Sequence, residues 1–108
     1  MTSDGHRAVF LRDGRQWSRI AVHELLYLEA ADNCTTVHTA TRDYILSRML
    51  KDVLDGIADP RIVRVHRSHA VNLDRVTAVS DNGLHVDGRW FPIGRSYREE
   101  VLGRLKLL

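Results

Sequence analysis

The sequence predicts a mainly β domain of the α+β class with two short α-helices. Short apolar stretches recur along the chain, and several of them alternate apolar with polar residues, as half-buried strands do. Turn-forming dipeptides lie among them, and because these accept positive φ angles they predict tight hairpins between antiparallel strands. The dipeptides are Asp13-Gly14, Asn82-Gly83 and Asp87-Gly88.

The candidate strands follow one another through most of the chain. Their apolar residues are at positions 9–11, 25–28, 37, 44–46, 62–65, 76–79, 84–86 and 90–91. Most of these stretches are too short to form helices, so the chain is expected to be dominated by short antiparallel strands.

The first helical segment runs from Ser47 to Ile57, where apolar residues recur every three or four positions. Ser47 is expected to cap its start, because a serine hydroxyl can accept a free amide of the first turn. Gly56 and the following Asp59-Pro60 dipeptide are expected to end it.

A second helical segment begins at Ser96. Ser96 and Glu99 have the spacing of a capping box, in which each side chain satisfies a free amide at the helix start. An apolar stripe follows at Val101, Leu102 and Leu105. Roughly 40 residues of strand-like sequence separate the two helices, so they do not form a helix-turn-helix pair.

The chain has 108 residues, which suits one compact domain over residues 8–108 behind a flexible polar tail of residues 1–7. Its single cysteine, Cys34, excludes a disulfide within the chain, so the fold does not require an oxidising compartment. No apolar run approaches the ~20 residues of a membrane span, and the N-terminus lacks the apolar core of a signal peptide. We therefore expect no membrane insertion and a cytoplasmic location.

The formal net charge is only +2, but the arginines are segregated from the acids. One group is Arg61, Arg64, Arg67 and Arg75, and a second is Arg89, Arg95 and Arg98. Such local basic patches are typical of polyanion-binding proteins, although solvated surfaces also carry them.

The stretch 64–72 is unusually rich in hydrogen-bond donors. Its polar side chains suit phosphate oxygens, and the planar guanidinium of Arg67 suits the O6 and N7 atoms of guanine in a major groove. The alternative is a polar turn beside an edge strand. Asn72 fits that structural alternative better, because asparagine often fixes the backbone of a turn.

A second donor-rich segment spans residues 92–98. Arg95 directly precedes the expected helix cap, so its side chain can project from the rim of the domain. Ser96 and the first helical amides can take a phosphate, and Arg98 is a further candidate. The alternative is a plain strand-to-helix connection.

The third segment, residues 29–36, has the small polar groups of a hairpin loop. Asn33 can read adenine, and Thr35 can contact a phosphate or a thymine methyl group. A structural hairpin with the asparagine in a left-handed conformation is an equal alternative.

With these segments in place, the sequence resembles the LytTR family, the output domain of many bacterial response regulators. The similarity extends over residues 20–105. Its marks are the run 26–30, Tyr44, the helix at 49–57, the motif Arg64-Val65-His66-Arg67-Ser68, the run 71–73 with Val76, and the run 92–97.

The resemblance implies an elongated set of small antiparallel sheets that binds double-stranded DNA through loops entering successive major grooves. Base contacts then fall to Arg67, Arg95, Asn33 and Cys34, the last at a place where relatives often have an aromatic residue or a histidine. The candidate phosphate contacts are Arg64, His66, Ser68, Thr35, Ser96 and Arg98.

The resemblance also implies binding to repeated half-sites, and hence a homodimer on DNA. Most relatives carry a receiver or another sensor domain, which this sequence lacks. We therefore expect a sensor or receiver partner, supplied in trans or by a missing domain.

An enzyme is the first alternative class. Cys34 and His38 have the residue types of a thiol nucleophile and its base, but no third orienting group accompanies them. The spacing of His66 and His69 suits a metal, yet no cysteine or acidic ligand lies nearby. No glycine-rich nucleotide fingerprint is present. We expect no catalytic residues, metal or cofactor.

A protein-interaction module is the second alternative. Such a domain could use its first helix or an edge strand to bind a signalling partner. A pure interaction module has no need for Arg67 and Arg95 on neighbouring loops, so the placement of these arginines favours DNA binding.

Overall fold

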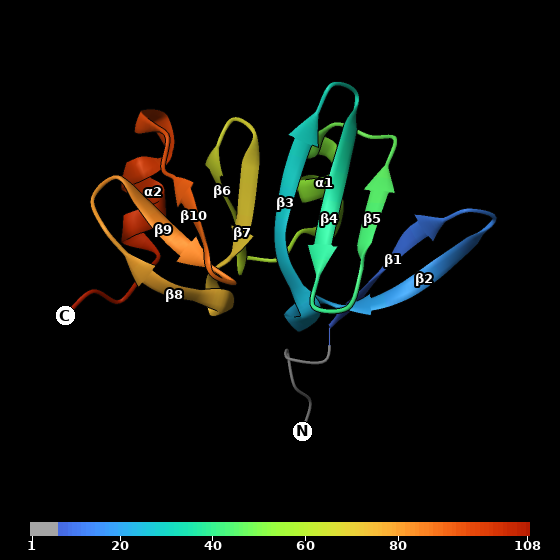
Figure 1. Ribbon diagram of the computed structural model, residues 1–108, viewed down its shortest axis with the longest axis horizontal. Coiled ribbons are helices and arrows are strands. Elements are labelled where there is room, and N and C mark those ends of the chain that lie inside the picture. Colours follow the sequence, from blue (N-terminus) through green and yellow to red (C-terminus); the bar gives the residue numbers. More distant parts are fainter. Residues whose placement is uncertain (1–6) are drawn as a thin grey trace.

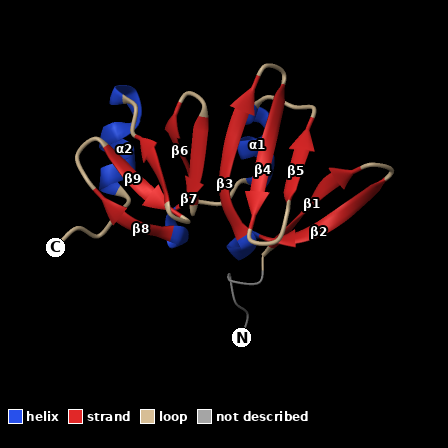
Figure 2. Ribbon diagram, in the orientation of Figure 1, coloured by secondary structure: helices blue, strands red, loops and turns tan. Residues whose placement is uncertain are grey.

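The computed structural model describes residues 7–108, which form three antiparallel sheets and two α-helices arranged side by side in a plate of 44 × 41 × 24 Å (Figures 1 and 2). The helices are α1 (Leu50–Ile57) and α2 (Arg98–Gly103). This architecture confirms the predicted mainly β class with small antiparallel sheets and two short helices.

A five-stranded sheet forms the centre of the domain, with the strand order β5-β4-β3-β7-β6. A two-stranded hairpin lies beyond β5 and a three-stranded sheet beyond β6 and β7 (Figure 1). The central strands are β3 (Leu25–Ala31), β4 (Cys34–Thr39), β5 (Asp43–Leu46), β6 (Ile62–His66) and β7 (His69–Asn72). The others are β1 (Ala8–Asp13), β2 (Gln16–Ala21), β8 (Val76–Val79), β9 (Gly83–Val86) and β10 (Arg89–Pro92).

Each face of the central sheet contributes to a separate hydrophobic core. Leu28 and Ala70, which are paired across β3 and β7, lie in the core shared with α1 and the β1–β2 hairpin. The next pair along, Tyr27 and Val71, packs into the core shared with β8–β10 and α2. This division follows from the two-residue period of a strand, which sends successive side chains to opposite faces.

The turn dipeptides have different roles. Asp87 and Gly88 have positive φ angles of 53° and 77° and close the β9–β10 hairpin, as predicted. Asn82-Gly83 also lies at a hairpin, between β8 and β9, but neither residue has a positive φ angle and Gly83 is already the first residue of β9. A Cβ atom at Gly83 would lie 2.4 Å from the Trp90 ring, so close packing requires the glycine there.

The first helix differs from its prediction at its start. It begins at Leu50, with Met49 in the N-cap position and no side chain capping the free amides. Ser47 lies too far upstream of the first helical residue to act as its cap. The helix ends at Ala58, whose left-handed backbone (φ 48°) terminates it.

The second helix is also not capped as expected. A 3-10 turn, η4 (Arg95–Tyr97), precedes α2, so Ser96 lies within this turn and Tyr97 occupies the cap position of α2. No side chain caps either element, and the box between Ser96 and Glu99 is therefore not formed.

Asn72 has the structural role that the sequence indicates. Its side chain is fully buried, and Nδ2 donates to the carbonyl oxygens of Leu25 at 2.9 Å and Val22 at 3.3 Å. Its Oδ1 accepts the backbone N–H of Asp74 at 3.0 Å. These bonds tie the end of β7 to the beginning of β3.

Arg7 was expected in the flexible tail, but it is anchored to the end of α1. Its Nη1 lies 3.1 Å from a carboxylate oxygen of Asp59 and also donates to the carbonyl of Ala58 at 3.2 Å. The rest of the expected tail, residues 1–6, lies outside the described residues. No helix within residues 7–108 has the length and apolar character to cross a membrane.

Candidate nucleic-acid interface

Three connections lie along one edge of the domain, at the top of Figure 1. They are the β3–β4 turn at residues 32–33, the β6–β7 turn at residues 67–68, and the segment from residue 93 through η4. Neighbouring antiparallel hairpins place alternate turns at the same edge of a sheet. Asn33, Arg67 and Arg95 are far apart in the sequence and are brought to this one edge.

Arg64 supports the β6–β7 turn through two hydrogen bonds. Its Nε donates to the carbonyl oxygen of His66 at 3.3 Å, and a terminal nitrogen donates to the carbonyl of Arg67. Arg64 was predicted to bind phosphate, but its guanidinium is occupied by these two carbonyls. The structure therefore favours a supporting role for Arg64.

Arg67 itself is exposed at the tip of this turn. Among residues 7–108, no group forms a hydrogen bond or ion pair with its guanidinium, although its charge acts on His66. Only its backbone carbonyl is engaged, by Arg64. The side chain therefore projects from a fixed backbone and keeps all its donors available.

His66 stabilises the same turn from its inner side. The backbone N–H of Ser68 donates to His66 Nδ1 at 3.2 Å, so the hydrogen of the neutral ring is assigned to Nε2. Burial lowers the pKa of His66 below its usual value, and the positive charges of His69, Arg67 and Arg64 lower it further. A neutral His66 can still donate through Nε2, which suits a phosphate oxygen.

The segment that carries Arg95 is attached directly to β6. The backbone N–H of Gly94 donates to the carbonyl of Val65 at 2.7 Å. A Cβ atom at Gly94 would lie 3.1 Å from the Tyr97 ring and 3.7 Å from His66, so the two segments are in close contact. The guanidinium of Arg64 also lies 6.0 Å from the centre of the Tyr97 ring. The supports of Arg67 and Arg95 thus form one packed unit.

On its other side, the β6–β7 turn is attached to β3. The backbone N–H of Ala30 donates to the carbonyl of Ser68 at 2.8 Å. Glu29 binds His69 Nε2 at 3.1 Å and Arg89 at 3.2 Å. Burial alone would raise the pKa of Glu29, but the hydrogen bonds from His69 and Arg89 hold it below its ordinary value. Glu29 therefore remains a carboxylate that joins β3, β7 and β10.

The β3–β4 turn has a different character. Its left-handed residue is Asp32 (φ 52°) rather than Asn33, whose side chain is exposed. Cys34 is half-buried at the start of β4. Thr35 is fully buried, and its hydroxyl donates to the carbonyl of Arg48 at 2.8 Å. This placement contradicts the prediction that Thr35 contacts a phosphate, because its only polar side-chain atom is inside the domain.

The remaining candidates lie on η4 and the start of α2. Arg95 and Ser96 are exposed, and within the described chain the Arg95 guanidinium has no hydrogen-bond or ion-pair partner. Arg98 is exposed and lies 3.8 Å from Asp81, a separation at which a surface ion pair is weak. All three side chains are accessible to solvent.

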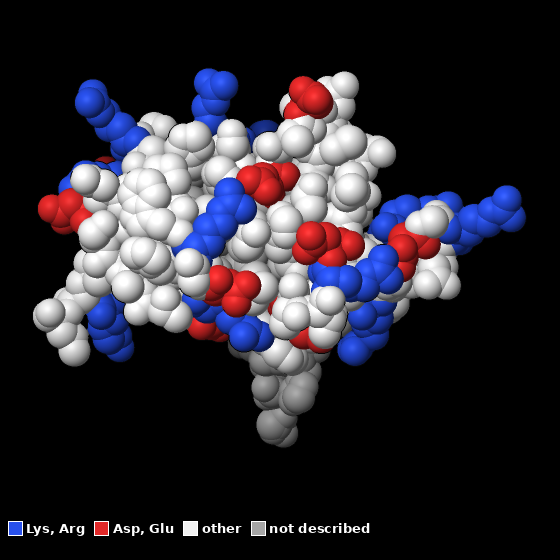
Figure 3. All heavy atoms as spheres, in the orientation of Figure 1, with Lys and Arg blue, Asp and Glu red and all other residues white. Residues whose placement is uncertain are grey.

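The charge distribution on the visible face agrees with this placement. Figure 3 shows basic side chains projecting from the upper edge over β6–β7 and near the start of α2. An acidic group lies at the tip of the β3–β4 turn, which carries Asp32. The basic part of the edge is therefore the part that carries Arg67 and Arg95.

The sequence did not indicate two supporting residues of this interface. Tyr97 packs against Gly94 and lies near Arg64, yet the sequence analysis gave its side chain no role. Glu29 was treated as part of a hairpin loop, but it joins three strands. A possible signal for Glu29 was its place among apolar strand residues, because a carboxylate there needs partners.

The described residues show no other arrangement that is typical of a chemical site. No group of three or more histidine, cysteine, aspartate or glutamate side chains within residues 7–108 is placed to hold a metal ion. His38 and Cys34 lie on the same strand, but His38 is bound by Asp43 at 2.9 Å and approaches Glu29 at 3.4 Å.

Exposed guanidinium groups on turns at one edge of a small β domain suit a polyanion such as nucleic acid. The sequence matches the family model of the LytTr DNA-binding domain over residues 15–106. The chain therefore belongs to the LytTR family, which is a family of DNA-binding domains rather than of enzymes.

Two similar proteins agree with this assignment. An uncharacterised response regulatory protein of Vibrio cholerae serotype O1 is 34% identical over 77% of this chain, and the chain spans 35% of the length of that relative. The solved LytTr DNA-binding domain of a methyl-accepting/DNA response regulator from Bacillus cereus has a TM-score of 0.72 and 22% sequence identity. The alignment covers 89% of this chain and 94% of that one, which supports the fold.

Proposed function

We propose that this domain binds double-stranded DNA in a sequence-specific manner, with Arg67 and Arg95 reading guanines in successive major grooves. The observation that carries the proposal is the presence of two exposed guanidinium groups at one edge, on backbones held together by the Gly94–Val65 hydrogen bond. A guanidinium can donate two hydrogen bonds to the O6 and N7 atoms of guanine. A fixed spacing between two such groups provides a register along the duplex.

In this proposal, the other candidate residues assist Arg67 and Arg95 in binding the DNA. Asn33 and Cys34 line a third loop that approaches the bases. Neutral His66, together with Ser68, Ser96 and Arg98, binds phosphate oxygens and so orients the domain. Arg64 acts through the turn, because its guanidinium is already bound to two carbonyls.

Binding to repeated half-sites as a homodimer on DNA is part of the same proposal. One copy presents a single set of reading turns, and a second copy on the next half-site would double the contacts. The input to such a regulator would come from a sensor or receiver partner, in trans or in a longer chain. A regulator that binds the chromosome of a bacterium acts in the cytoplasm, so we place the domain there as part of the same proposal.

Replacing Arg67 or Arg95 by alanine tests the proposal. Each change should cost about 1–3 kcal/mol of binding free energy and relax the preference at one base position. Binding sites selected from a random duplex library would give the preferred sequence, and gel shifts on that sequence would give affinities. Binding should also weaken steeply with salt, because phosphate contacts release counterions.

The matched control is Lys106→Ala, which removes an exposed positive charge from the C-terminal segment. It should leave affinity and base preference close to those of the wild type. If Arg67→Ala and Arg95→Ala both kept wild-type affinity and preference, sequence reading by these turns would be refuted. Salt-independent binding would favour the protein-interaction alternative instead.

A further inference from the structure

The β1–β2 hairpin and the neighbouring β5 carry an exposed apolar patch, which lies away from the three edge connections. The side chains of Phe10 and Trp17 are 59% and 60% exposed, and Ile45 of β5 is 71% exposed. Single exposed apolar residues are common on proteins, but several of them on neighbouring strands can mark an interaction site. Tryptophan in particular is enriched among residues that dominate binding energy.

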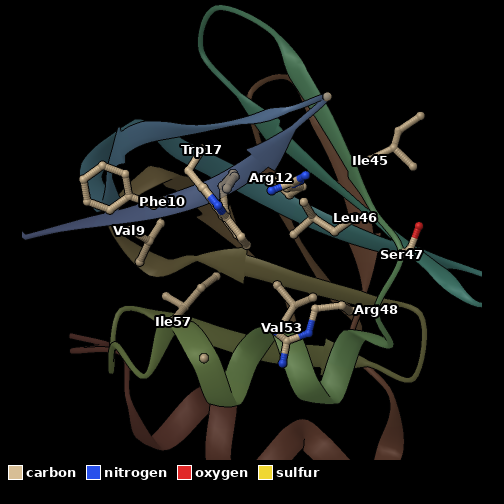
Figure 4. A pocket seen from close by; sticks show the side chains of 13 residues that line it. Val9, Phe10, Arg12, Trp17, Ile45, Leu46, Ser47, Arg48, Val53 and Ile57 are labelled. Carbon is tan, nitrogen blue, oxygen red and sulfur yellow. The ribbon is translucent and has the colours of Figure 1, made fainter.

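A groove of about 370 Å³ runs beside this patch, between the hairpin and α1 (Figure 4). Val53 and Ile57 of α1 line its floor, and Trp17, Arg12 and Arg48 lie around it. Its volume falls in the range of sites that accept a ligand or a few side chains. The groove can receive an apolar group of a partner without any change in the core.

Residues of two outer strands, β1 and β5, line the groove. In the described chain, β1 pairs only with β2, and β5 is the outer strand of the central sheet and pairs only with β4. β1 and β5 lie next to each other without hydrogen-bonded pairing, so each keeps one unpaired edge. Unpaired strand edges are common places for a segment of another chain to dock.

The surroundings of the groove are positively charged. Arg12, Arg15 and Arg19 are exposed on the hairpin, and Arg48 lines the groove. The acidic residue of the hairpin, Asp13, is occupied by Ser18 at 3.0 Å and by Arg42 at 3.3 Å. Figure 3 shows basic side chains concentrated along this hairpin. Asp43, the exposed acid of β5, is bound by His38 at 2.9 Å, and no acidic side chain lines the groove itself among the described residues.

The acidic residues of α1 do not neutralise the arginines around the groove. Asp55 is paired with Lys51 at 3.1 Å, and Asp52 does not line the groove. A second copy of the chain would place arginines against arginines, which opposes self-association through this surface. The same charge favours a partner that carries carboxylates.

We propose that the groove between the β1–β2 hairpin and α1 binds an acidic segment of a partner protein. An apolar side chain of this segment seats against Val53 and Ile57 beside Trp17, and flanking carboxylates pair with Arg12 and Arg48. This surface is separate from the DNA-binding edge, so the domain can hold a protein partner and DNA at the same time.

Peptide selection against the intact domain tests this proposal. A phage library of random twelve-residue peptides is selected on the wild-type domain, with Arg12→Glu as the counter-target. The selected peptides should be rich in aspartate and glutamate around an apolar residue. Fluorescence anisotropy with a labelled selected peptide should show at least about tenfold weaker binding to Trp17→Ser and to Arg12→Glu, and unchanged binding to Lys106→Glu.

Each other result would overturn the proposal. Failure to enrich acidic peptides on the wild type over Arg12→Glu would exclude an acidic partner at this groove. A concentration-dependent dimer in sedimentation velocity that Trp17→Ser abolishes would identify a second copy as the occupant. Weaker DNA binding by Trp17→Ser or Arg12→Glu would assign the hairpin to the DNA interface; we expect DNA affinity within about twofold of wild type for both.

Discussion

The β3–β4 and β6–β7 turns lie at the same edge of the domain and have the same length, but different contacts support them. The β6–β7 turn is held by Arg64, by the His66 ring and by a backbone bond from Ala30. The β3–β4 turn exposes the Asn33 side chain, which has no hydrogen-bond partner among the described residues, and carries the acidic Asp32. A base-reading side chain gains most from a fixed backbone, because less freedom is lost on binding. We therefore expect the β6–β7 turn to dominate specificity.

Replacing Arg64, which supports the β6–β7 turn, should have the largest effect on DNA specificity. Arg64→Ala leaves the carbonyls of His66 and Arg67 without their charged donor, whose hydrogen bonds are each worth about 1.5–3 kcal/mol. Affinity for the selected site should fall about tenfold or more, while affinity for random DNA falls less. Competition gel shifts with specific and random duplexes would measure both.

Arg64→Lys is the matched control, because it keeps the positive charge but loses the planar fork. If Arg64 acts by bracing the turn, the lysine variant should lose discrimination as the alanine variant does. Wild-type discrimination by Arg64→Lys would show instead that only the charge matters, as in a phosphate contact.

A smaller effect is expected at the unbraced turn. Asn33→Ala should cost about 1 kcal/mol or less in binding free energy, because it removes only neutral hydrogen bonds from an exposed side chain. Repeating the site selection with this variant would show the change in base preference. A loss as large as that of Arg67→Ala would mean that the two turns contribute equally and that bracing does not decide specificity.

The smallest effect concerns pH. Burial lowers the pKa of His66 in the folded state below its usual value of about 6.5, so the unfolded chain binds the proton more tightly. The stability that neutral His66 contributes is present above pH 6.5 and is lost as the pH falls through the folded-state pKa. Urea unfolding at several pH values should show this loss, and His66→Gln should reduce it. An identical pH dependence in both proteins would contradict this assignment.

The sequence predicted the positions of helices and hairpins better than the residues at which they begin and end. Helical periodicity located α1, because apolar spacing is set by the helix itself, but the cap at Ser47 was wrong because capping depends on the path of the preceding chain. The hairpin at Asp87-Gly88 was correct, since both residues must adopt positive φ. Gly83 has a packing role that depends on the ring of Trp90 on the adjacent strand β10, and a local pattern does not contain that information.

The candidate site shows a similar division. The exposed positions of Arg67 and Arg95 agree with the predictions from donor-rich turns, although their contacts with bases remain predictions. Thr35 could have been excluded from the sequence, because alternation along β4 places it on the same face as buried Val37. The supporting role of Arg64 could not have been predicted, because the sequence does not show that the turn directs two carbonyls toward its guanidinium.

The hydrogen bond between Gly94 and Val65 has a consequence for how regulators of this design can diverge. In the proposed function, the backbone sets the distance between the two base contacts, and the exposed side chains at positions 67 and 95 set the identity of the bases. Substitutions at these two positions would change the preferred bases one at a time, while the spacing of the target sequence stayed constant.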